Sequence, residues 1–172
     1  MKSDGFWAKD GKPLTLRMIS YSSRAEMPVI TETVANMLMQ AGIKTEIKMY
    51  TWPGMRDLTK KGEYDAYTVF WTPEMTGHPD THLKAHFSSN SNMTQSGYGN
   101  AELDDLLVAA RGLDAGAERD AAYQKILQII HQDAPIMPLV HKVYVAASHK
   151  GVKNFRVHPS GFFFNFKEVW KE

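Results

Sequence analysis

An alternating run, a helical pattern and a second alternating run follow one another in the sequence, and this order limits the fold more than any other feature. The first run covers residues 14–20 and the second covers 43–49, where apolar and polar residues alternate as in a half-buried strand. Between them, apolar residues recur at helical spacing from Ile30 to Ala41, and Gly42 provides a left-handed stop. A strand, a helix and a strand in this order predict a right-handed parallel crossover.

A third strand is expected at residues 65–71, because this run is nearly apolar and rich in β-branched and aromatic residues. Such a composition is typical of a strand covered on both faces, so we expect it near the centre of the sheet. Residues 136–147 predict one or two further strands. The predicted fold class is α/β, a mixed sheet with parallel core strands and flanking helices.

Further helices are expected between and after these strands. A short one covers about 53–61, and a second short candidate lies around 80–87. Two longer helices follow, each with an apolar stripe, and Asn100 and Asp114 are the residues that can cap the first and the second of them.

The composition excludes several classes of protein. A chain of 172 residues fits one domain of ordinary size. Lys and Arg number 20 against 19 Asp and Glu, and no basic stripe is visible, so nucleic acid is not an expected partner. The absence of cysteine excludes a disulfide scaffold and a thiolate metal site. No cofactor is expected. The sequence contains no Gly-rich phosphate loop, and it contains no Gly-x-Ser-x-Gly elbow for a nucleophilic serine.

A long segment from Thr72 to Asn100 is rich in Pro, Gly, Ser, Asn and His. It leaves the carboxyl end of the third predicted strand, which is where ligands bind in open α/β sheets. A loop of this length inside a compact domain is more often functional than incidental. We therefore place the candidate site at the start of this loop.

Several separated motifs now resemble a known family. The strings at 97–107, 114–123, 133–139 and 150–155 look like the carboxyl-terminal part of the dipeptide, oligopeptide and nickel solute-binding proteins that serve ABC importers. The pairing of residues 62–65 with a strand ending in Phe70-Trp71, and the terminal residues 166–170, resemble that family too.

The resemblance implies a solute carrier rather than an enzyme. Family members have two lobes that close over the ligand outside the cytoplasmic membrane and then dock on a permease. It implies that residues 1–172 form a single ligand-binding lobe, a fragment that captures a short peptide or similar small solute without chemical change. Its expected partners are the solute, the missing N-terminal lobe and the ABC permease, and the parent is expected to be periplasmic or attached to the cell surface.

The resemblance also implies site residues. In peptide-binding relatives, the strand end matching Phe70, Trp71 and Thr72 lends backbone groups to the peptide, and an acidic residue beyond it pairs with the peptide's amino group. Glu74 holds that position here, although the relatives usually carry Asp in a Gly-rich turn. The alternative is structural: Trp71 caps the core and Glu74 is a solvated loop acid.

Three histidines form a second candidate site. His78, His82 and His86 are spaced by four, so on a helix they rise along one face and could chelate nickel or another divalent metal. This is the alternative function, metal or metal-complex binding. The structural alternative is a polar helix face with incidental histidines. A metalloprotease site is disfavoured, because Pro79 stands where its general base would be.

The terminal run from Phe162 to Phe166 contains four phenylalanines in five positions. The resemblance directs this segment toward the other lobe; in isolation it would fold back or bind a second copy. A free-standing interaction domain is therefore a third possibility, with this segment as its interface.

Overall fold

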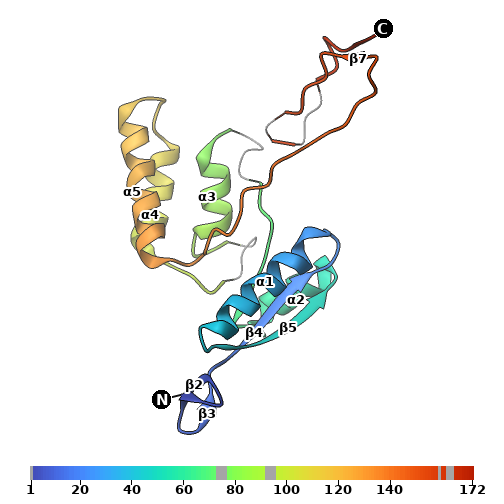
Figure 1. The fold of residues 1–172 in the computed structure, drawn as a ribbon. Helices are drawn as coiled ribbons and strands as arrows, with labels where there is room; N and C mark the ends of the chain where they lie inside the picture. The colour runs from blue at the N-terminus through green and yellow to red at the C-terminus, as the bar shows by residue number, and fades with distance from the viewer. Residues whose placement is uncertain (1, 73–76, 92–95, 159, 162–164) are drawn as a thin grey trace. The chain divides into compact units, whose positions relative to one another are not determined.

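The structure is a computed structural model that describes residues 2–72, 77–91, 96–158, 160–161 and 165–172. The chain divides into two compact units (Figure 1). Unit 1 comprises Met1–Trp71 and Ser89–Gly99, and unit 2 comprises Thr72–Ser88 and Asn100–Glu172. Two sequence predictions fall outside the described residues, namely those on Glu74 and on residues 162–164.

A three-stranded parallel sheet forms the centre of unit 1. β4 (Thr15–Tyr21) lies between β5 (Lys44–Tyr50) and β6 (Ala66–Tyr67), with Met18 opposite Ile47 in the register. Both neighbours run parallel to β4, which confirms the parallel core and the α/β class.

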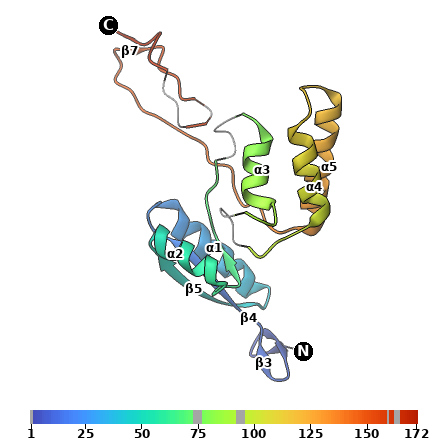
Figure 2. The same ribbon diagram turned by 180° about the vertical axis from the view of Figure 1, so that it is seen from behind.

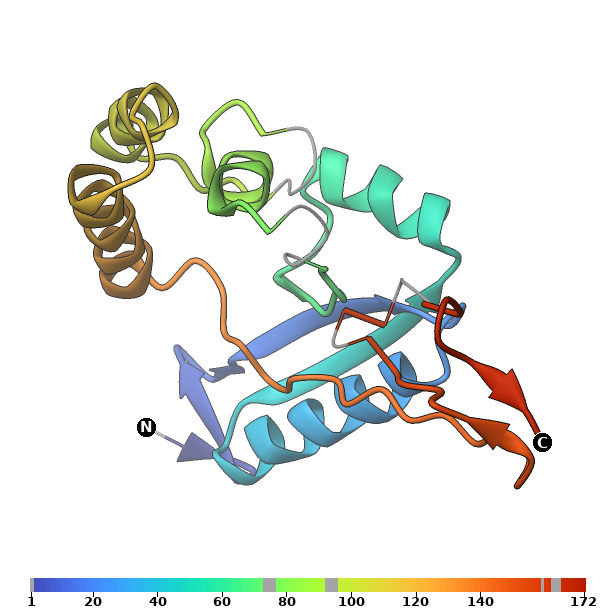
Figure 3. The same ribbon diagram turned by 90° about the horizontal axis from the view of Figure 1, so that it is seen from above.

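Two helices cover the two faces of this sheet. α1 (Glu26–Gln40) connects β4 to β5 and packs on one face, and α2 (Trp52–Lys61) packs on the other (Figure 3). The Thr45 hydroxyl of β5 donates to the Ala35 carbonyl of α1 at 3.4 Å, so the face that includes Thr45 is the one that α1 covers.

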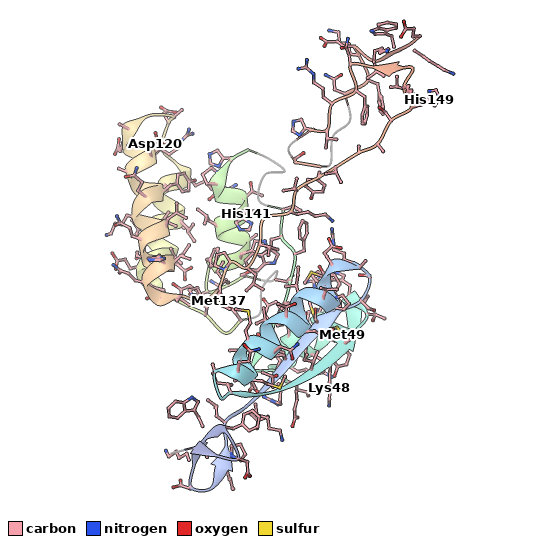
Figure 4. All side chains as sticks on the ribbon, viewed as in Figure 1. Lys48, Met49, Asp120, Met137, His141 and His149 are labelled. Atoms are coloured by element: carbon pink, nitrogen blue, oxygen red, sulfur yellow. The ribbon has the colours of Figure 1, made fainter. Side chains whose placement is uncertain are left out.

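The alternation in β5 sets which side chains meet α1. Thr45, Ile47 and Met49 are half-buried, whereas Lys44, Glu46 and Lys48 are exposed. Figure 4 labels the neighbours Lys48 and Met49, one from each set. The predicted division of this strand into a buried and an exposed face is therefore confirmed.

The core of unit 1 gathers where the strands end. Ile19 and Tyr21 of β4 are buried with Met27 of α1 and Met55 of α2. Tyr50, Leu58, Tyr64, Tyr67, Val69 and Phe70 pack around them. Burial of apolar surface by both helices is the main term that stabilises this unit.

The third strand differs from its prediction. Only Ala66–Tyr67 pair as a strand, and β6 lies at an edge of the described sheet rather than at its centre. Thr68 N still donates to the Ile19 carbonyl at 3.1 Å, but Phe70 N donates to the Tyr21 hydroxyl at 3.4 Å. Beyond Thr68, a side chain thus replaces the next backbone partner, which is why the strand ends early.

The first fourteen residues contain a small antiparallel sheet that the sequence analysis missed. β1 (Lys2–Ser3), β2 (Phe6–Lys9) and β3 (Lys12–Pro13) are joined by two Asp-Gly turns in which all four residues have positive φ. Asp-Gly pairs favour this hairpin turn. The Trp7 indole donates to the Ala41 carbonyl at 2.9 Å and ties the sheet to the end of α1.

Unit 2 contains three helices that lie side by side (Figure 2). α3 (Pro79–Phe87), α4 (Ala101–Arg111) and α5 (Ala117–Asp133) cover the regions where helices were expected. The buried side chains between them are Leu83, Phe87, Leu103, Leu107, Ala110, Tyr123, Ile126 and Ile130. Among the described helices of the chain, none is long and apolar enough to span a membrane.

The caps of these helices were predicted with mixed success. Asn100 accepts from Leu103 N at 3.1 Å, as predicted, and its amide also donates to Asp133 at 2.8 Å. The prediction for Asp114 was wrong, because α5 begins three residues later and its N-cap is Gly116, with no side-chain cap. An extra turn after α4 moves the helix start away from Asp114.

The prediction of strands at 136–147 was also wrong. Residues 134–149 form neither helix nor strand in the described structure. A strand requires a neighbour for its backbone groups. In the described residues that follow α5, β7 (Val152–Lys153) pairs with β8 (Trp170–Lys171) and not with any part of 134–149. Gly161, at φ 67°, lies so close to the Tyr144 ring that a Cβ there would overlap it.

Candidate ligand-binding site

Aromatic residues gather at the carboxyl edge of the parallel sheet. Tyr21 ends β4, Tyr50 ends β5, and Phe70 and Trp71 follow β6. Because parallel strands end at the same edge, these residues are brought together there. Phe70 and Trp71 were predicted as site residues, whereas the contribution of Tyr21 was missed.

Tyr21 is the centre of this cluster. Its ring meets the ring of Trp52, at the start of α2, edge to face with centroids 4.9 Å apart. Its hydroxyl accepts from Phe70 N, and burial raises the pKa of the phenol. The hydroxyl therefore stays protonated near neutral pH and can act as a hydrogen-bond donor and acceptor.

A cation lies over the same cluster. The Arg24 guanidinium carbon is 4.4 Å from the centroid of the Phe70 ring, within the range of a cation–π contact. Arg24 is half-buried and lies two residues before α1 begins. A guanidinium held in this way has a fixed position and keeps donors for an anionic partner.

Trp71 and Thr72 are half-buried, and the boundary between the two units falls between them. Glu74 lies outside the described residues, so its role as an amine-binding acid stays a prediction. Trp52, 38% exposed, offers an indole surface on unit 1 that the sequence analysis did not single out.

Of the three histidines predicted as a metal site, two lie together and the third, His78, has a different role. His82 and His86 lie together on α3, with ring centroids 4.6 Å apart. His78 is the N-cap of α3: its Nδ1 accepts from Asp80 N at 3.2 Å, and its ring meets Tyr123 edge to face. No group of three or more His, Cys, Asp or Glu side chains that could hold a metal occurs among the described residues.

The environment of His86 disfavours its charged form. Burial, and next the charge of His82, lower the pKa of His86 to about 4. A neutral imidazole is the form that binds metals. His82 and His86 together could supply at most two protein ligands to a metal ion. His141 and His149 lie on the carboxyl-terminal arm, at positions that Figure 4 labels.

A buried acidic residue links the helices of unit 2. Asp80 is 9% exposed, and its Oδ2 is 3.7 Å from Arg111 Nε on α4. Its Oδ1 and the Tyr123 hydroxyl are buried without a hydrogen-bond partner in the described part of the chain. Burial, and next the Asp80 charge, raise the pKa of Tyr123.

No protein-family model matches the chain. Among curated proteins, it is 34% identical to the haem-binding protein A of Haemophilus influenzae over 125 residues, which are 70% of this chain and 22% of that protein. It is 27% identical to the di/tripeptide-binding protein 2 of Pseudomonas aeruginosa over 151 residues, 86% of this chain and 28% of that protein. The chain therefore spans less than a third of the length of these relatives.

Solved structures of binding proteins have a similar fold. The periplasmic binding protein DppA of Helicobacter pylori, in complex with the peptide STSA, is similar at a TM-score of 0.70 and 27% identity, over 92% of this chain and 31% of that chain. NikA of Staphylococcus aureus, in complex with Ni(L-His)2, shares the fold at a TM-score of 0.72 and 21% identity, over 98% of this chain and 36% of that chain.

The relatives found by sequence and the similar solved structures are binding proteins, and those structures share the α/β fold described above. The chain belongs to the dipeptide, oligopeptide and nickel family of ABC-transporter solute-binding proteins.

Proposed function

We propose that the chain is one ligand-binding lobe of a solute-binding protein of an ABC importer, and that it holds a short peptide or similar small solute without changing it chemically. The observation that carries this proposal is the arrangement of Tyr21, Arg24 and Phe70 at the carboxyl edge of the parallel sheet. The peptide-binding relatives support a peptide over other solutes.

Each part of a peptide has a suitable partner in this arrangement. Arg24 would bind the terminal carboxylate by charge-assisted hydrogen bonds. The backbone near Phe70 and Trp71 would form hydrogen bonds with the extended main chain of the peptide. Such bonds do not depend on the peptide's side chains. The faces of Trp52 and Trp71 would cover apolar side chains, and Glu74 remains the candidate for the amino group.

The partners follow from the same proposal. A second, N-terminal lobe of the parent protein would close over the solute, exclude water and raise the affinity, so that the ligand favours the closed state. The parent protein would act in the periplasm or at the cell surface and deliver the solute to a membrane permease. The relatives are binding proteins, which supports transport rather than catalysis.

Titration of the chain with trialanine, followed by the amide NMR signals of Phe70 and Trp71, tests the proposal. Arg24→Gln should weaken binding tenfold or more, since a hydrogen bond to a charged group contributes about 1.5 to 3 kcal/mol. Arg156→Gln, which changes an exposed arginine of unit 2, is the matched control. Equal binding of trialanine and its carboxyl-terminal amide would contradict the role of Arg24.

The alternative function is binding of nickel or another divalent metal, and the neighbouring rings of His82 and His86 are the observation that favours it. Calorimetry with nickel chloride tests it. If the alternative holds, the pair of changes His82→Ala and His86→Ala abolishes nickel uptake, whereas His131→Ala on the exposed side of α5 leaves it unchanged.

A further inference from the structure

Thr68 makes an unusual set of contacts just before the candidate site. Its hydroxyl oxygen lies 2.6 Å from the Ser20 hydroxyl of β4 and 2.6 Å from the Thr31 hydroxyl of α1. The Thr31 hydroxyl in turn donates to the Met27 carbonyl at 2.7 Å. One side chain therefore joins the end of β6 to both a strand and a helix.

These hydroxyls are removed from water. Ser20 and Thr31 are 0% exposed and Thr68 is 7% exposed. The Thr68 hydroxyl donates to Ser20 Oγ, so the Thr31 hydroxyl hydrogen is the one shared between the Thr68 oxygen and the Met27 carbonyl. A buried hydroxyl that loses its partner costs about 1 to 3 kcal/mol, so the chain of contacts strongly favours one arrangement of the three residues.

The position of this chain of hydroxyls matters because strand pairing has just ended. After Tyr67, the backbone is held by Thr68 N at the Ile19 carbonyl, and then by Phe70 N at the Tyr21 hydroxyl. The regular ladder that would fix a longer strand is absent from the described residues 68–72. Side-chain hydrogen bonds of Thr68 and Tyr21 therefore contribute to the direction in which the segment leaves the sheet.

The same hydroxyls also support the other groups at the edge. Ser20 precedes Tyr21, whose hydroxyl receives Phe70 N, and the Met27 carbonyl lies in the first turn of α1, shortly after Arg24. The strand end, the tyrosine and the arginine are thus all connected to the Thr68 hydroxyl within a few residues.

We propose that Thr68 is the positioning residue of the ligand-binding edge: its hydroxyl, shared between Ser20 and Thr31, sets the orientation of Phe70 and Trp71. This proposal deepens the proposed function, on which its meaning for ligand binding rests. The orientation itself is a property of the unliganded chain, so it can be measured without a ligand.

The test is the backbone dynamics of Phe70 and Trp71 in the full chain, measured by NMR relaxation. Thr68→Val keeps the shape of the side chain and removes the hydroxyl. The order parameters of the two amides should fall from about 0.85 to below about 0.6. Thr68→Ser retains the hydroxyl and should restore the rigid values.

Thr59→Val is the matched control, because Thr59 is also 7% exposed, lies on α2 and is not a member of this chain of hydroxyls. It should lower stability without changing the amides of Phe70 and Trp71. The proposal is overturned if Thr68→Val leaves both amides rigid, or if Thr59→Val loosens them equally.

If Thr68→Val does not fold, Ser20→Ala removes only one of the contacts. It should give a smaller loss of order at Phe70 and Trp71, and no change there contradicts the proposal. A chain that passes these tests but does not bind trialanine refutes the proposed function and leaves the positioning role intact.

Discussion

Arg17 of β4 and Asp65, the residue that precedes β6, form an ion pair with two hydrogen bonds. Arg17 Nε is 3.0 Å from one carboxylate oxygen of Asp65, and its Nη2 is 2.9 Å from the other. The same carboxylate accepts from Arg17 N at 2.7 Å, so the pair fixes the start of β6 beside β4.

The pair predicts a specific effect of acid on stability. The hydrogen bonds from Arg17 lower the pKa of Asp65 from its ordinary value of 3.8 to about 2. The stabilisation is therefore complete above pH 3.8 and is lost as the pH falls toward 2. Asp65→Asn should remove this part of the acid dependence in urea unfolding. Asp57→Asn, at an exposed position, should keep it.

His86 predicts a second pH effect at a higher pH. Its pKa of about 4 in the folded chain lies below the ordinary histidine value of 6.5, so the unfolded chain binds the proton first as the pH falls. Stability contributed by the neutral ring is full above pH 6.5 and decreases between pH 6.5 and 4. His86→Leu should flatten the unfolding free energy in this interval. An unchanged slope, with His131→Leu as control, would contradict the burial of His86.

Asn100 should contribute more to stability than Asp114, although both were predicted as caps. Asn100→Ala removes the acceptor for Leu103 N and the contact with Asp133, at a cost of about 1 to 2 kcal/mol. Asp114→Ala removes no cap and should stay within about 0.5 kcal/mol. Thermal unfolding measures both, and equal losses would refute the observed start of α5.

Gly161 should tolerate no side chain. Its positive φ and the Tyr144 ring both oppose a Cβ, so Gly161→Ala should weaken the hydrogen bonds from Ser160 N and Gly161 N to His158 and speed the hydrogen exchange of these two amides. Gly112→Ala is the matched control, since a Cβ there meets its nearest atom at 3.6 Å with ordinary φ. Equal rates of amide hydrogen exchange in the two variants would contradict the close contact between Gly161 and Tyr144.

The sequence allowed prediction of those parts of the fold in which one face of an element is buried. The alternation at 43–49 reports the two faces of β5 directly, and the helical spacing after Pro28 reports α1. Residues 65–71 were misread because their composition reflects burial, which Tyr67 and Phe70 do show, rather than backbone pairing. Composition alone does not separate these two properties.

The candidate site was predicted only in part. Trp71 was placed at a strand end, and the loop that follows was recognised from its composition. Tyr21, Arg24 and Trp52 were missed because each looks ordinary in its own segment. The available signal was their position, since each lies at or within three residues of the end of a parallel strand, and such ends meet at one edge.

The contacts of the Thr68 hydroxyl with Ser20 and Thr31 affect how homologous genes should be compared. Threonine and valine have nearly the same volume, and exchange between them passes unnoticed in alignments scored by size and β-propensity. Here that exchange at position 68 would leave the fold recognisable while uncoupling the segment that we propose to contact the ligand. Under that proposal, ligand specificity can diversify through a residue outside the proposed contact surface.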